Sequence, residues 1–175
     1  MTETIGADPA FQIECTHEPF PGSQESVFGR MCVRFGDRIM GDFDEPACML
    51  DVTANFFDIA LKRISDHAEP ELCALSDEAL WQRLNALIYL DDRRTAEQVY
   101  ADAVRYSRFD FLTGGGESFD KVKCFFVARA DDVRVLFQNG DQPIRSATVA
   151  RSVFVETLQA WLQWFDREQE RSKHL

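Results

Sequence analysis

The sequence predicts an α+β fold in which an antiparallel sheet is covered by helices. Strand-like segments, either alternating or continuous in apolar residues, occur in the first 40 residues and again after residue 121. Between these regions, and at the C-terminal end, apolar residues recur every three or four positions. Short turn signals join the strand-like segments, which is typical of hairpins. We therefore expect about five to six strands, helices inserted between two hairpin regions, and a C-terminal helix packed on the sheet.

The first hairpin region covers the N-terminal 40 residues. Apolar and polar residues alternate in VFGRMCVRF (27–35), so one face can meet a core while the arginines of the other face water. Gly36-Asp37 fits a two-residue turn, after which Arg38–Met40 returns the chain. A short strand is expected over Phe11–Glu14, and the proline-containing stretch His17–Ser26 is expected to be a loop.

Three helices are predicted between the hairpin regions. Residues 49–64 place their apolar side chains on one helical stripe and their polar side chains on the other. Ser76 can cap a second helix, which begins with acidic residues. Thr95 followed by Gln98 has the spacing of a capping box, for a helix that runs to about Tyr106. The side chains expected to be buried are Met49, Val52, Phe56, Phe57, Ala60, Leu61 and Ile64 in the first helix, and Leu80, Leu84, Leu87 and Ile88 in the second.

The second hairpin region follows. Val122–Ala128 is nearly continuous in apolar content, as expected of a central strand, and Ala130–Phe137 is the next strand. Asn139-Gly140 is a strong turn signal because both residues tolerate positive φ. It leads into a strand over Ile144–Val149. A helical stripe then predicts the C-terminal helix, with Phe154, Leu158, Trp161, Leu162 and Phe165 on its buried face.

Length and composition indicate one domain. A chain of 175 residues with 45% hydrophobic content can bury one core, and no linker divides it, so we expect a single domain over residues 1–175 with its core at about 10–168. No N-terminal run combines basic residues with an apolar stretch, so we expect no export signal, and no apolar segment approaches the roughly 20 residues that cross a bilayer. The five cysteines include no C-x-x-C pair. They favour reduced, buried thiols in a cytoplasmic protein.

The net charge of -11 is concentrated in two segments. Residues 1–29 and 39–61 each contain five acidic residues and neither Lys nor Arg, whereas the remaining 20 acidic residues nearly balance the 19 basic ones. A field of one sign repels nucleic acid and anionic membranes, and attracts a basic partner. Alternatively, the acidic residues only keep the protein soluble.

The sequence contains no recognisable catalytic, metal or cofactor motif. Gly114–Gly116 are contiguous and precede a strand-like segment, which suits neither a phosphate loop nor a dinucleotide site. We interpret them as turn residues. The three histidines lack a second His or Cys at ligand spacing, so no metal or cofactor is expected. Asp42 with Asp44, or Glu117 with Asp120, could perform acid–base chemistry, although no calcium-loop spacing is present.

Two blocks of the sequence, taken together, resemble a known protein family. FGRMCVRFGDRIMGDFD (28–44) precedes the first helix, and FDFLTGGGESFDKVKCFFVARADDVRVLF (109–137) contains a Glu-x-Phe-Asp motif at Glu117, Phe119 and Asp120. This arrangement resembles immunity protein family 42 of bacterial polymorphic-toxin systems over most of residues 10–168. The resemblance implies a protein without enzymatic activity that binds a cognate secreted toxin domain and blocks its active site or substrate groove.

A toxin with a basic groove would explain why the acidic residues are concentrated. Toxins that act on nucleic acid usually present basic grooves, which an acidic partner reaches quickly. We hypothesise that the contact surface includes Asp42, Asp44, Glu45, Asp110, Glu117 and Asp120. Capping of loop amides is the alternative for Glu117 and Asp120. Two other functions stay open: an adaptor or oligomerising domain that self-associates through a sheet edge, and a small enzyme whose site is assembled only in space.

Overall fold

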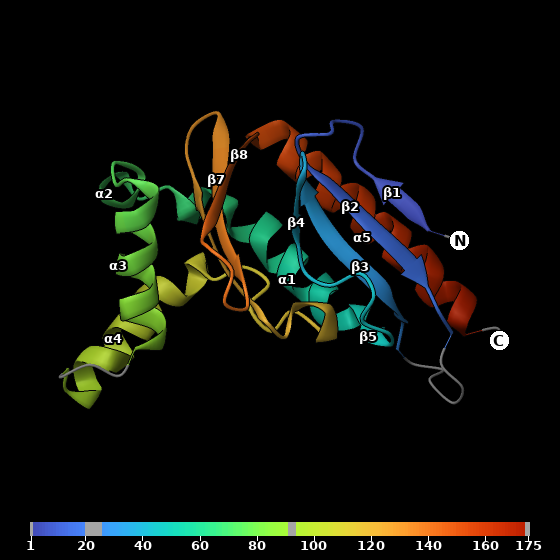
Figure 1. The fold of residues 1–175 in the computed structure, drawn as a ribbon, viewed down its shortest axis with the longest axis horizontal. Coiled ribbons are helices and arrows are strands. Elements are labelled where there is room, and N and C mark those ends of the chain that lie inside the picture. Colours follow the sequence, from blue (N-terminus) through green and yellow to red (C-terminus); the bar gives the residue numbers. More distant parts are fainter. Residues whose placement is uncertain (1, 20–25, 91–93, 174–175) are drawn as a thin grey trace.

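The structure, a computed structural model, describes residues 2–19, 26–90 and 94–173, and it confirms the α+β class (Figure 1). The strands are β1 (Glu3–Ile5), β2 (Gln12–His17), β3 (Phe28–Phe35), β4 (Arg38–Met40), β5 (Cys48–Met49), β6 (Val122–Ala128), β7 (Asp132–Asn139) and β8 (Arg145–Ala150). The α-helices are α1 (Leu50–Arg63), α2 (Pro70–Cys73), α3 (Asp77–Tyr89), α4 (Ala96–Tyr106) and α5 (Arg151–Ser172). Three short 3₁₀ helices are η1 (Ile64–His67), η2 (Ser107–Phe109) and η3 (Glu117–Phe119).

The strands form two antiparallel sheets instead of one. The first sheet has the order β1-β2-β3-β4, with β5 also paired to β3, and the second has the order β6-β7-β8. Side chains join the sheets where β4 approaches the β7–β8 hairpin. The Asn139 amide nitrogen donates to the Ile39 carbonyl at 2.9 Å, and its amide oxygen accepts from the Gly41 N–H at 3.3 Å. Arg38 donates to the carbonyl of Ser146. The side chain of Asn139 therefore links the edges of the two sheets, in place of backbone hydrogen bonds between β4 and β7.

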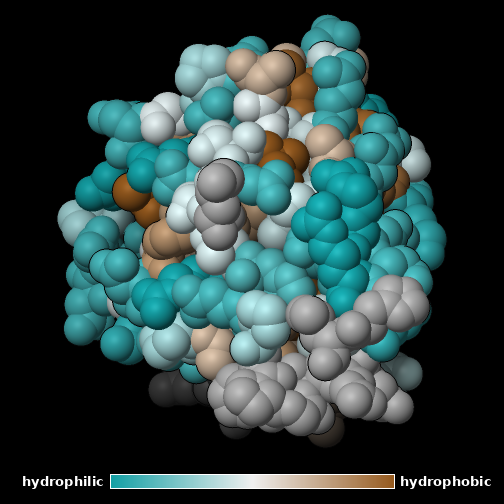
Figure 2. Space-filling view, turned by 90° about the vertical axis from the view of Figure 1, so that its right-hand side faces the viewer, coloured by the Kyte–Doolittle hydropathy of each residue, from teal (hydrophilic) through white to brown (hydrophobic). Residues whose placement is uncertain are grey.

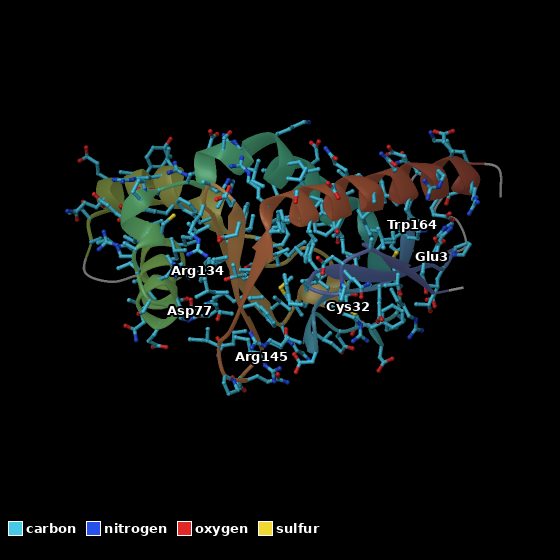
Figure 3. The ribbon with its side chains drawn as sticks, turned by 90° about the horizontal axis from the view of Figure 1, so that it is seen from above. Glu3, Cys32, Asp77, Arg134, Arg145 and Trp164 are labelled. Atoms are coloured by element: carbon cyan, nitrogen blue, oxygen red, sulfur yellow. The ribbon has the colours of Figure 1, made fainter. Side chains whose placement is uncertain are left out.

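Two clusters of buried apolar side chains hold the layers together. The main core lies between the inner faces of both sheets and the helices α1 and α5, which Figure 3 shows on one side of the strands. A second cluster joins the other face of the second sheet to α3, through Phe125, Leu136 and Trp81 among others. The continuous apolar content of β6 thus reflects burial on both faces. The central strand of that sheet is β7, not β6 as the sequence predicted.

Capping signals in the sequence predicted the starts of α3 and α4 correctly. The Ser76 hydroxyl accepts a hydrogen bond from the Ala79 N–H, and both bonds of the Thr95–Gln98 capping box are present. Leu80 and Leu84 are buried as expected, whereas Leu87 and Ile88 are only partly buried. The strands β1 and β5 and the four-residue helix α2 were not predicted, because each is too short to show a periodic pattern.

The ends of the chain lie together beside the first sheet. β2 continues to His17, beyond the strand predicted over Phe11–Glu14, and residues 20–25 of the predicted loop lie outside the described residues. Figure 2 shows the end of the molecule near β1 and the C-terminal part of α5, where the surface is mainly hydrophilic and apolar residues form small separate areas. All five cysteines are free, and four are buried. None of the described helices is long and apolar enough to cross a bilayer.

Candidate functional site

Two loops that are distant in the sequence meet beside the start of α1. The Asp42 N–H donates to the carbonyl oxygen of Ser118 at 2.8 Å. Gly41 has a φ of 92°, and a Cβ at this position would lie 2.8 Å from a ring carbon of Phe119. The loop after β4 therefore packs directly on η3. This contact joins the two sequence blocks, residues 28–44 and 109–137, that carry the family resemblance.

The glycine-rich segment turns the chain against α1. Gly114 and Gly116 have φ angles of 66° and 115°, which favour glycine. A Cβ on Gly116 would lie 2.9 Å from the sulfur of Cys48, just before α1. The hydroxyl of Thr53, on the first turns of α1, donates to the carbonyl of Gly115. The segment is thus a turn whose backbone packs closely on α1.

Glu117 has a structural contact at the junction between the glycine-rich segment and the start of α1. Its carboxylate accepts a hydrogen bond of 2.6 Å from the backbone N–H of Met49, the N-cap residue of α1. A negative charge at a helix N-terminus is also favoured by the helix dipole. The amide-capping alternative considered for Glu117 is therefore present in the structure. Because the residue remains exposed, its carboxylate can still face a partner.

Five of the six proposed contact residues lie on adjoining loops, and we call them the acidic surface: Asp42, Asp44, Glu45, Glu117 and Asp120. Asp42 accepts a hydrogen bond of 3.0 Å from the Asp44 N–H, which shapes the loop. Arg30 donates to the Asp44 carbonyl at 3.0 Å, so it anchors the backbone and leaves the carboxylate free. Among the described residues, Asp44, Glu45 and Asp120 have no ion-pair partner.

Asp110 lies apart from the acidic surface. The Tyr89 hydroxyl donates a hydrogen bond to its carboxylate, and its backbone forms an isolated bridge with Phe125. Burial raises the pKa of Asp110, and it also raises the pKa of the Tyr89 hydroxyl. Lys123 lies above the Tyr89 ring, 4.5 Å from its centre. The carboxylate of Asp110 is therefore partly enclosed between α3 and β6.

Most acids of the N-terminal segment are paired within the fold. Glu14 bonds Arg34 at 2.6 Å, and Glu18 bonds Arg30 at 2.8 Å, both across the open face of the first sheet. Glu3 accepts a hydrogen bond from the Trp164 indole N–H at 2.9 Å (Figure 3). The excess charge of this segment is therefore partly neutralised. The carboxylates of the acidic surface, by contrast, form no ion pair among the described residues.

A hydrogen-bonded chain joins β2 to the end of α5, and sequence spacing gave no sign of it. His17 Nδ1 lies 2.8 Å from a carboxylate oxygen of Glu168, and His17 Nε2 lies 3.2 Å from the hydroxyl of Ser172. The order of groups resembles a catalytic triad. However, Ser172 is buried and its hydroxyl donates to the Glu168 carbonyl at 3.0 Å. Arg171 also pairs with Glu168. The chain fastens α5 to the sheet.

His67 is a second buried histidine, with both ring nitrogens against backbone carbonyls. Nδ1 lies 2.6 Å from the carbonyl oxygen of Arg63, and Nε2 contacts that of Arg108. The ring stacks on Phe126 at a centroid distance of 4.0 Å. Burial lowers the pKa of His67, and this outweighs the two carbonyl contacts, which raise it. The native state therefore favours the neutral ring.

The free energy of unfolding is expected to fall as the pH drops below the ordinary histidine pKa of 6.5, because the unfolded chain then binds a proton that native His67 resists. The slope from this group is at most about 1.4 kcal/mol per pH unit. Denaturant unfolding at pH 8 to 5 should show a shallower dependence for His67→Gln than for the unchanged chain. Equal slopes for the two proteins would contradict this role of His67.

The described residues contain no group of three or more His, Cys, Asp or Glu side chains that could hold a metal ion. His17 and His67 are both occupied by protein contacts, and His174 lies outside the described residues. The carboxylates of the acidic surface face solvent at the ends of loops.

Comparison with known proteins identifies a family and a similar fold. The family profile described as Immunity protein 42 matches residues 1–164. The chain is also similar in fold to a solved structure described as CdiI from Burkholderia dolosa AUO158, with a TM-score of 0.67 and 12% sequence identity. The alignment covers 93% of this chain and 99% of that one. A search of curated proteins found no match.

Proposed function

Since the chain belongs to the immunity protein 42 family, we propose that it neutralises its cognate toxin by covering a basic active site or substrate groove with the acidic surface. Membership makes it an immunity protein, a toxin inhibitor and not an enzyme, with a toxin domain as partner. The basic character of that domain and the contact residues are the parts that we propose. We place the encounter in the cytoplasm, where the five free thiols would stay reduced.

The observation that carries the proposal is a group of unpaired carboxylates on loops held by the fold. Asp44, Glu45 and Asp120 have no counter-ion among the described residues, whereas Glu14 and Glu18 are paired with arginines. Unpaired charges of one sign create the potential that speeds encounter with a partner of opposite sign. The acidic surface is therefore the part of the described molecule best suited to a cationic groove.

Backbone and side-chain hydrogen bonds hold these loops before any partner arrives. The Asp42 N–H bonds Ser118, the Met49 N–H bonds Glu117, and Arg30 bonds the carbonyl of Asp44. A preformed surface loses little conformational entropy on binding. We assign Asp110 a packing role beside Tyr89 in this proposal, because its carboxylate is partly enclosed.

Co-expression with the cognate toxin domain, which we expect to be the C-terminal domain of a secreted protein encoded by a neighbouring gene, tests the proposed function. The toxin domain alone is expected to arrest growth, and the chain is expected to restore growth and to co-purify with the domain at low salt. An empty vector serves as the control. If the chain is folded and abundant but neither restores growth nor co-purifies, the proposed function is wrong.

A further inference from the structure

The helix α4 exposes its apolar face to solvent. Ala96, Tyr100, Ala103 and Val104 lie at intervals of three, four, seven and eight residues, so they share one side of the helix. We call them the apolar stripe. All four are exposed, with Tyr100 at 73% and Val104 at 66%, and Tyr106 is the only buried residue of α4. An amphipathic surface helix normally buries its apolar side.

Polar contacts attach α4 to the rest of the protein. Arg94, just before the helix, bonds Asp102 at 2.7 Å and donates to carbonyl oxygens near the end of α3, including that of Ala86 at 2.8 Å. Arg105 pairs with Glu69. Tyr106 of α4 lies in the second core cluster, and Val99 and Asp102 are half-buried. The apolar stripe lies on a side of the helix that these contacts leave exposed, where a partner can pack against it.

The apolar stripe leads to a cavity at the end of α4. Ser107 follows Val104 by about one turn, and it lines a cavity of about 170 Å³ together with Phe56 and Ile59 of α1. Ile59 is itself 43% exposed. Arg63, Arg108 and Asp110 also line this cavity, so the exposed apolar side chains of α4 and α1 flank a partly polar hollow with room for a side chain of a partner. Isolated exposed apolar residues are ordinary, but a grouped set marks a contact surface.

We propose that the apolar stripe anchors the toxin domain, while the acidic surface guides the encounter; this inference rests on the proposed function. Exposed charges at the rim of an interface mainly raise the association rate. Slow dissociation depends on desolvated anchor residues, among which Tyr is enriched. Figure 1 shows α4 and β5 towards opposite ends of the molecule, with the yellow segment that follows α4 running between them, so a partner that contacts both surfaces spans this side of the molecule.

Charge and area favour the toxin domain over a second copy of this chain as the occupant. Two copies that each carry a net charge of -11 repel each other, whereas a basic domain is attracted. The 11 residues of α4 extend about 16 Å, so a contact of α4 with its own copy falls short of the roughly 800 Å² per partner of a stable interface. A toxin that contacts both α4 and the acidic surface can bury that area.

The test measures binding kinetics of Tyr100→Ala/Val104→Ala with the purified cognate toxin domain on a biosensor. We expect dissociation about 10- to 100-fold faster and an association rate within twofold of the unchanged chain. Ile39→Ala, which removes an exposed aliphatic side chain from β4, is the matched control and should leave both rates unchanged. Thermal unfolding checks that each variant is folded.

The outcomes separate the two proposals. If the unchanged chain binds the toxin domain and the Tyr100→Ala/Val104→Ala variant dissociates at the same rate, the apolar stripe is not the anchor and the proposed function stands. If the free chain self-associates and this variant abolishes the self-association, a second copy occupies the stripe and the inference is overturned. If the unchanged chain does not bind the domain, the proposed function and this inference are both wrong.

Discussion

Asp44→Lys/Asp120→Lys is expected to slow association with the cognate toxin domain about 10- to 100-fold at low salt, since steering by a charged patch changes association rates over this range. Both carboxylates are exposed and unpaired among the described residues, so the fold should tolerate the change. The association rate should also lose most of its dependence on ionic strength. Stopped-flow mixing at 20 to 300 mM salt measures both quantities.

A matched variant separates local from total charge. Glu156→Lys/Asp166→Lys changes the net charge equally, but it places the new charges on exposed positions of α5. This control should retain most of the association rate, because the salt around a protein screens charges beyond about 10 Å at 0.1 M. Equal slowing in both variants would mean that only the net charge matters. Unchanged rates in both would remove electrostatic steering from the proposed function.

Gly29→Ala is expected to lower the free energy of unfolding by about 3 kcal/mol or more, the upper end of what an overpacked substitution costs. A Cβ at Gly29 would lie 2.0 Å from the carbonyl oxygen of Thr16, which belongs to the backbone of the neighbouring strand. Neither strand can move alone, because Gly29 also pairs with Cys48 of β5. Denaturant unfolding followed by tryptophan fluorescence gives the difference directly.

The control for this substitution is Gly36→Ala. Gly36 has a φ of 61°, but a Cβ there would have no atom within 4 Å, so the expected loss is only about 1 to 2 kcal/mol. Similar losses for both variants would show that β2 and β3 separate at Gly29 at a much lower cost than expected. Because β5 leads into α1 at the junction, a distorted Gly29 should also weaken toxin binding.

Local chemistry explains how much of the fold the sequence revealed. Caps act within one turn, so Ser76 and the pair Thr95–Gln98 marked their helices correctly. The division into two sheets was not predicted, because strand pairing between segments about 100 residues apart, such as those of Ile39 and Asn139, leaves no local signal in the sequence. β5 has two residues, and its pairing with β3 is visible only in three dimensions.

The acidic surface was only partly accessible to sequence reasoning. Composition located Asp42, Asp44 and Glu45, and motif likeness suggested Glu117 and Asp120, but their packing in adjoining loops follows from the contact of Asp42 with Ser118. The pairing of Glu14 with Arg34 could have been suspected, because strand alternation places both on the open face. Charge counting alone treated Glu14 as unpaired.

The exposed side of α4 shows a further limit of local sequence signals. The capping box at Thr95 and Gln98 predicted this helix, but a cap does not tell which side of the helix is buried. Whether the apolar side meets a core or solvent depends on the tertiary contacts of the helix, here Arg94 with Asp102 and Arg105 with Glu69. The sequence alone therefore does not tell whether the apolar side of a helix is exposed to a partner; the three-dimensional structure is needed.

Amide hydrogen exchange, measured on the chain alone and with the cognate toxin domain, locates the bound surface without any substitution. Slower exchange in residues 41–47 and 117–121 is the expected result, together with unchanged exchange in β2, whose outer face already pairs Glu14 with Arg34. Protection confined to β2 and β3, with both loops exchanging as they do in the free chain, would contradict the proposal that the acidic surface covers the toxin.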